Sequence, residues 1–187
     1  MTTRIEKDFY FQTAVHFEGK FYVNSYELTL SVLVETDSIR EQNIAMDRTS
    51  HFLTSVIQNS ILVHSADKET VQKYRNIGLK VCELPEEPYD QILSMVLIQK
   101  LNSIMEGRLK ITDMVLGSTL SDGVRFTIVS EVAEAVLSGN HWWNKSTICL
   151  NDDEACCDRD HKDNVVKLFD DTHWVDIGLS WKEKGKR

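Results

Sequence analysis

The chain has 187 residues, of which 42% are hydrophobic and 27% charged, and this length fits one globular domain with or without an appendage. Its 29 acidic and 21 basic side chains give a net charge of -8, which disfavours nucleic acid and anionic membrane surfaces as partners. No window approaches the roughly 18 apolar residues of a membrane helix, and the start MTTRIEKDFYFQ lacks the apolar stretch of a secretory signal. We therefore expect a cytoplasmic protein without membrane partners, whose cysteines are reduced thiols.

Two long strands are expected at the start of the chain. Residues 9–17 alternate apolar and polar side chains, and residues 22–36 do the same, as half-buried strands do. The short break Glu18-Gly19-Lys20 between them predicts an antiparallel hairpin. In the first of these strands, His16 falls on the more polar face.

An amphipathic helix is expected next. Apolar residues recur with helical spacing from residue 52 to residue 61, and Asp47 is a plausible N-cap near the start of this helix. Residues 65–76 then indicate a polar loop or a partial helix. Residues 79–84 read as a short edge strand.

A second helix and a second hairpin complete the pattern. The helix covers residues 92–105, with Asp90 at its start and Gly107 just past its end. Alternation then predicts strands at residues 109–116 and 124–128. The resulting order, ββααββ, predicts an α+β fold in which an antiparallel four-stranded sheet carries two helices on one face.

The part of the chain beyond this pattern has a different composition. We assign residues 1–130 to the domain and residues 131–187 to a C-terminal extension. The extension holds all four tryptophans and three of the four cysteines. Because disordered segments are poor in aromatic residues, we expect the extension to pack on the domain or on a neighbouring subunit.

Several segments of the first 130 residues carry a family resemblance. In chain order they are IEKDFYFQTAVHF, VNSYELTLSVLVETD, NIAMDRTSHFL, SILVH and LPEEPYDQIL. In order and spacing the chain resembles the family of 6-pyruvoyl tetrahydropterin synthase and 6-carboxytetrahydropterin synthase. The resemblance implies the tunnelling T-fold, in which the sheets of several subunits form a barrel with active sites between subunits. It therefore implies a homo-oligomer with a pterin-like or purine-like small ligand.

The zinc site of that family is represented here in part. Family members bind zinc through one histidine of the first strand and a His-x-His pair of the second. His16 matches the first ligand as a remnant of the site, whereas Asn24 stands in the segment that corresponds to the pair. The loop between the two strands has no counterpart of the family's catalytic cysteine. A catalytic zinc needs three protein ligands, and only one of them is matched here, so we expect no cofactor. If the protein does bind a metal, the resemblance implies zinc.

Other family positions are also altered. His64 matches a proton-relay histidine and is the candidate catalytic residue, but Val63 stands where the family has an aspartate, which leaves the imidazole without an orienting carboxylate. The segment Leu116-Gly117-Ser118-Thr119 replaces the Glu-Thr pair that anchors the substrate in the family. We take Glu86 or Glu87 as the counterpart of the family's glutamate at the helix start. The candidate ligand-binding residues are therefore His16, Asn24, Glu86 and Glu87.

The extension contains an alternative metal site. Its candidate ligands are Cys149, Cys156, Cys157 and His161. Thiolates and imidazole together suit zinc, but adjacent cysteines lack the C-x-x-C spacing with which two thiolates grip one ion. A solvated acidic loop with free thiols accounts for the same residues.

Two hypotheses on function follow. In the first, the chain is a divergent family member that binds a pterin-like or purine-like ring, or acts as a scaffold, without zinc-dependent catalysis. In the second, it is an active pterin-processing lyase whose site is rearranged around His16 and His64.

Overall fold

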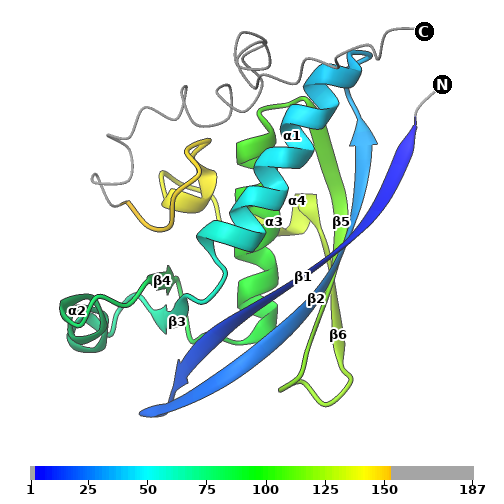
Figure 1. The fold of residues 1–187 in the computed structure, drawn as a ribbon. Helices are drawn as coiled ribbons and strands as arrows, with labels where there is room; N and C mark the ends of the chain where they lie inside the picture. The colour runs from blue at the N-terminus through cyan, green and yellow to red at the C-terminus, as the bar shows by residue number, and fades with distance from the viewer. Residues whose placement is uncertain (1–2, 153–187) are drawn as a thin grey trace, which may run out of the picture. The chain divides into compact units, whose positions relative to one another are not determined.

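Two long strands joined by a short turn form the start of the described chain (Figure 1). The computed structural model describes residues 3–152, which belong to a single unit. Strand β1 (Arg4–Phe17) pairs with β2 (Lys20–Val34) along its whole length, from Arg4 opposite Leu33 to Phe17 opposite Lys20. Glu18 and Gly19 both have positive φ angles, 50° and 72°, which the tight turn requires and which glycine adopts without strain. The predicted hairpin is therefore confirmed.

The sheet has six strands rather than the predicted four, in the order β4-β3-β1-β2-β5-β6. Strands β5 (Leu109–Ser118) and β6 (Arg125–Val129) extend the first hairpin antiparallel, as predicted. Two short strands, β3 (Ile61–His64) and β4 (Val81–Leu84), are added in parallel on the other side of β1. The α+β class is confirmed. The strand count was wrong because the expected helix covers the start of β3, and because β4, which matches the expected short edge strand, belongs to the same sheet.

Helix α1 (Ile39–His51) begins earlier than the expected start near Asp47. Ser38 is its N-cap, and the Ser38 hydroxyl accepts a hydrogen bond from the Glu41 amide at 3.4 Å. A π-helical turn, Phe52–Val56, follows α1, and the chain then enters β3. His64 consequently lies at the end of a strand.

One face of the sheet carries the main core. Helices α1 and α3 (Asp90–Met105) cover this face, as predicted, and α4 (Ser130–Val136) lies beside α3 (Figure 1). Alternation along β1 and β2 sends one set of side chains to these helices. The fully buried members include Leu28, Leu30 and Val32 of β2 and Leu93, Leu97 and Leu101 of α3.

A small second core lies on the opposite face. Helix α2 (Lys68–Asn76) occupies the segment that we had expected to be a polar loop or a partial helix. Its residue Val71 packs with Ile61, Val63 and Val81 of the short strands, and Ala14 of β1 joins this group. The even-numbered residues of β1 thus face α2 at this end of the sheet.

The described part of the extension packs on α3. Strand β6 runs directly into α4, and a 3-10 turn, Trp142–Asn144, contacts α3. Trp142 and Trp143 are 4% and 5% exposed and belong to the main core. The predicted placement of residues 153–187 lies outside the described residues. Within the described part of the chain, no helix combines the length and apolar character needed to cross a membrane.

Candidate functional site

One pocket brings together three of the residues singled out in the sequence. His16 at the end of β1, His64 at the end of β3 and Glu87 in the loop before α3 line a pocket of about 170 Å³. The other lining residues are Glu18, Gly19, Val63 and Asp67. We call this the histidine pocket. Its walls come from three separate segments of the chain, residues 16–19, residues 63–67 and Glu87, so the fold and not local sequence assembles it.

His64 has a carboxylate partner after all. Its Nδ1 lies 3.4 Å from Oε1 of Glu87, and the two side chains are 29% and 47% exposed. The expectation that Val63 leaves this imidazole without an orienting carboxylate is therefore wrong. Glu87 reaches it from the loop that leads into α3, a contact that no local motif announces.

Asp67 is a pocket residue that the sequence reading missed. It is the N-cap of α2, and its carboxylate accepts a hydrogen bond from the Thr70 amide at 3.1 Å. The hydrogen bonds from Thr70 hold the pKa of Asp67 below its ordinary value, with smaller contributions from His16 and His64. Three carboxylates, Asp67, Glu87 and Glu18, thus surround the two imidazoles.

The histidine pocket does not have the ligand set of a catalytic zinc. Within residues 3–152, no three His, Cys, Asp or Glu side chains are arranged to hold a metal ion. His16 instead makes an edge-on contact with the ring of Tyr74, with 5.7 Å between the ring centroids. The donor set of the pocket therefore fits hydrogen bonding and ring contacts better than metal coordination.

Two other predicted ligand-binding residues lie away from this pocket. Asn24 is 1% exposed, and its Oδ1 accepts hydrogen bonds from the Thr119 hydroxyl at 2.9 Å and from the Leu120 amide at 3.2 Å. It holds the loop between β5 and β6. Glu86 is exposed and does not line the pocket.

The alternative metal ligands of the extension fall mostly on residues that are not described. Cys149 is 1% exposed and disulfide-bonded, in contrast to the reduced thiols that we expected. Cys156, Cys157 and His161 lie outside the described residues. A disulfide-bonded Cys149 offers no thiolate to a metal, so it is removed from the predicted ligand set, and metal binding by the other three residues stays a prediction.

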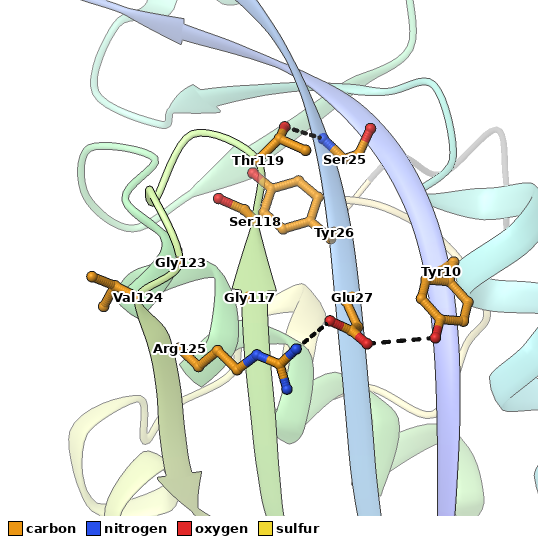
Figure 2. A pocket seen from close by; sticks show the side chains of 10 residues that line it. All are labelled: Tyr10, Ser25, Tyr26, Glu27, Gly117, Ser118, Thr119, Gly123, Val124 and Arg125. Carbon is orange, nitrogen blue, oxygen red and sulfur yellow. Dashed lines mark hydrogen bonds and ion pairs between the residues drawn. The ribbon is translucent and has the colours of Figure 1, made fainter.

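A second, shallower pocket of about 330 Å³ lies on the face of the sheet away from α1 and α3 (Figure 2). One wall is a polar row across three strands: Arg125 of β6 bonds Glu27 of β2 at 2.7 Å, and the Tyr10 hydroxyl of β1 donates to Glu27 at 3.5 Å. At the upper end, Thr119 accepts a hydrogen bond from the Ser25 amide at 3.2 Å. We call this the sheet pocket.

Polar side chains beside the sheet pocket are partly or fully buried. The Ser118 hydroxyl donates to Asp90 at 2.5 Å, and burial raises the pKa of the Asp90 carboxyl, an effect that the bond from Ser118 partly offsets. Burial, and then the charge of Asp90, raises the pKa of Tyr26 well above its ordinary value. The Tyr26 hydroxyl is buried and makes no well-formed hydrogen bond in the described structure, although the neighbouring side chains of Thr13 and Asn24 partly offset the rise in its pKa. Sequence reasoning missed Asp90 in this role because the residue reads simply as the first residue of a helix.

Comparison with known proteins supports the fold and gives no evidence on function. No family model matches the chain, and no curated protein matches it. Among solved structures, an uncharacterized protein from Wolinella succinogenes has a TM-score of 0.51 at 10% identity, over 69% of this chain and 98% of that one. The 6-pyruvoyltetrahydropterin synthase of Plasmodium vivax has a TM-score of 0.41 at 8% identity, over 68% and 97%. That of Plasmodium falciparum has a TM-score of 0.40 at 9% identity, over 68% and 96%. At such identities the likeness to the Wolinella protein concerns the fold alone.

Proposed function

We propose that this chain forms a T-fold homo-oligomer whose histidine pocket binds a small pterin-like or purine-like ring without zinc-dependent catalysis. The observation that carries the proposal is the meeting of His16, His64 and Glu87 in one pocket. The resemblance of the sequence singles out the same three residues, and they come from three separate segments.

The chemistry of the pocket suits such a ring. A carboxylate such as Glu87 accepts hydrogen bonds from the ring N–H and amino groups that pterins and purines present. An imidazole both stacks on a planar ring and donates or accepts at its edge. Three carboxylates and two imidazoles favour a ligand rich in N–H donors over an anionic one.

The size of the pocket supports a site that a second subunit completes. Its volume of about 170 Å³ is below the roughly 300–1,000 Å³ of usual ligand pockets. The structure offers edges for assembly: β3 meets β1 only at Ala14 and Val15, so most of the outer edge of β1 has no strand partner in the described structure. Strand β6 is the other edge of the sheet. Two open edges on opposite sides suit head-to-tail pairing of sheets from several copies.

Two measurements test the proposal. Light scattering after size-exclusion chromatography should give a defined oligomer, and calorimetric titration with a set of pterins and purines should identify a ligand. His64→Asn and His16→Asn should each weaken that binding, whereas His51→Asn, which alters an exposed histidine of α1, should not. A monomer, or binding that neither substitution alters, would refute the proposal.

One contact favours a second candidate, the active pterin-processing lyase. The approach of Glu87 to His64 is the arrangement in which a carboxylate orients an imidazole for proton transfer. Incubation with reduced pterins that carry a C6 side chain, followed by mass spectrometry, would detect an eliminated product. Elemental analysis of protein prepared without chelators distinguishes the two candidate functions further. About one zinc per chain would contradict the proposal of ring binding without zinc.

A further inference from the structure

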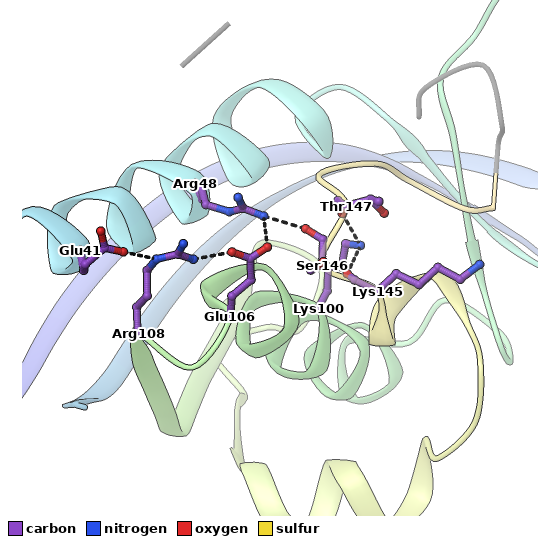
Figure 3. A network of polar contacts seen from close by, with 8 residues as sticks. All are labelled: Glu41, Arg48, Lys100, Glu106, Arg108, Lys145, Ser146 and Thr147. Carbon is purple, nitrogen blue, oxygen red and sulfur yellow. Dashed lines mark hydrogen bonds and ion pairs between the residues drawn. The ribbon is translucent and has the colours of Figure 1, made fainter. Parts of the chain in front are cut away.

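A buried lysine fastens one segment of the chain to helix α3. We call residues 142–151 the strap. Lys100 of α3 is fully buried, and its Nζ donates to the carbonyl oxygens of Trp142, Lys145 and Thr147 at 2.8, 2.9 and 2.7 Å. Figure 3 shows the bonds to Lys145 and Thr147. The same Nζ lies 5.4 Å from the centre of the Trp142 ring. Three carbonyls match the three N–H donors of an ammonium group, so the strap closes around Lys100.

Helix α1 holds the strap from a second side. The guanidinium of Arg48 donates to the Ser146 carbonyl at 2.8 Å and also bonds Glu106 at 3.2 Å. Glu106 in turn bonds Arg108, which reaches Glu41 of α1 (Figure 3). The carbonyl groups of residues 142 and 145–147 are thus directed at cations from two helices. This loop conformation depends most on Lys100, whose three bonds are buried or partly buried, because carbonyls withdrawn from water without donors are costly.

The strap also forms hydrogen bonds with β4, the edge strand of the sheet. The Asn151 side chain donates from Nδ2 to the Val81 carbonyl at 2.7 Å and accepts at Oδ1 from the Glu83 amide at 2.8 Å. The indole N–H of Trp142 donates to the Glu83 carbonyl at 3.0 Å. These side chains bond the outer edge of β4 as a further strand would, and an edge bonded in this way is fixed in position.

Strand β4 joins the strap to β3, the strand that ends at His64. Glu83 lies opposite Val63 in the parallel ladder and Leu84 lies opposite His64. The Ser65 amide donates to the Leu84 carbonyl at 2.8 Å. We propose that Lys100 is a positioning residue which, through the strap and β4, holds His64 in its place in the pocket. The proposal takes the pocket from the proposed function but needs no ligand for its test.

Amide hydrogen exchange followed by NMR tests the connection. Asn151→Ala removes the bonds to β4 without touching the α3 core, and should speed exchange at the Glu83 and Ser65 amides about tenfold, as loss of two hydrogen bonds implies. The NMR signals of the His64 ring should also shift in the Asn151→Ala variant. Exchange at Leu30 and Val32 in the main core should not change. Asn144→Ala is the matched control, since the Asn144 side chain bonds only Leu137 and Gly139 and not β4.

A chemical rescue tests the role of the ammonium group. Lys100→Ala should reproduce the changes at Glu83, Ser65 and His64, and ammonium or methylammonium chloride should reverse them by refilling the carbonyl cage. Sodium chloride and tetramethylammonium chloride, the second of which has no N–H donors, should not. Lys145→Ala, a strap lysine that is 40% exposed, should behave as the unmodified protein.

The outcomes separate the two proposals. Unchanged Glu83, Ser65 and His64 signals in Asn151→Ala would overturn the positioning role, and so would Lys100→Ala effects that extend equally to Leu30 and Val32. Intact coupling together with failure to bind any pterin or purine would leave the positioning role standing and remove the proposed function alone.

Discussion

Oε1 of Glu87 lies 3.4 Å from Nδ1 of His64, and this contact links the loop that precedes α3 to the end of β3. It gives the imidazole a carboxylate neighbour that the sequence around it lacks. Any activity of the histidine pocket, whether binding or catalysis, should therefore depend on Glu87 more than on its neighbour Glu86.

Glu87→Gln should shift the NMR signals of the His64 ring and weaken ligand binding about three- to tenfold. Its effect on the free energy of unfolding should stay within about 0.5 kcal/mol, because a half-exposed ion pair contributes little to stability. Urea unfolding and calorimetric titration measure the two quantities. Glu86→Gln serves as the control, and an equal loss of binding in that variant would contradict the assignment.

Asp67→Ala should lower the free energy of unfolding by about 1 kcal/mol, as loss of an N-cap does. The pKa of Asp67 is lowered in the folded protein, so the ionised carboxylate contributes stability above its ordinary pKa of about 3.9, and this contribution is lost as the pH falls through the lowered value. The difference between the two proteins in urea unfolding should therefore shrink in acid. Asp67→Asn, which keeps an acceptor, should cost less than the alanine variant at neutral pH.

Asp90→Asn should show the opposite dependence on pH. Burial raises the pKa of Asp90, so the folded state keeps the proton to a higher pH than the unfolded state does, and stability falls as the pH rises through that interval. Because Asn has no such cost, the stability of the variant relative to the original protein should increase from about pH 4 to pH 7. Urea unfolding at several pH values measures the trend, and a flat difference would be incompatible with a raised pKa.

Tyr26→Phe should keep or raise the free energy of unfolding, by up to about 1 kcal/mol. The substitution removes a buried hydroxyl that makes no well-formed hydrogen bond with its neighbours Thr13 and Asn24, while the ring keeps its stacked contact with Phe11 at 4.9 Å. Tyr26→Ala, which empties the site, should cost about 3–5 kcal/mol. A loss above about 1 kcal/mol in the phenylalanine variant would mean that the hydroxyl is bonded.

The long elements could be predicted because their patterns are local. Alternation over β1 and β2 predicted the hairpin, and the segment from Asp90 to Gly107 combined apolar spacing with a suitable start and stop, which matches α3 closely. The short edge strand expected at residues 79–84 is confirmed as β4, Val81–Leu84.

The short parallel strands and the partners of the pocket could not be predicted in this way. Ile61–His64 is a brief apolar run, which periodicity alone does not distinguish from the end of a helix. Its strand conformation depends on Val15 and Val81, which are far away in the chain. The burial of Lys100 is equally non-local, because the carbonyls that satisfy it lie in the strap.

The presence of two separate cores has a consequence for the geometry of the pocket. His16 belongs to the long hairpin, whereas His64 and Asp67 belong to the β3–α2–β4 unit, which buries Ile61, Val63, Val71 and Val81 in the small core and Leu62, Cys82 and Leu84 in the main core. Because β3 and β4 are buried on both faces, this unit cannot move against the hairpin without disturbing the main core. The spacing of the two imidazoles is therefore set by both cores, and a ring that enters the pocket has to match it.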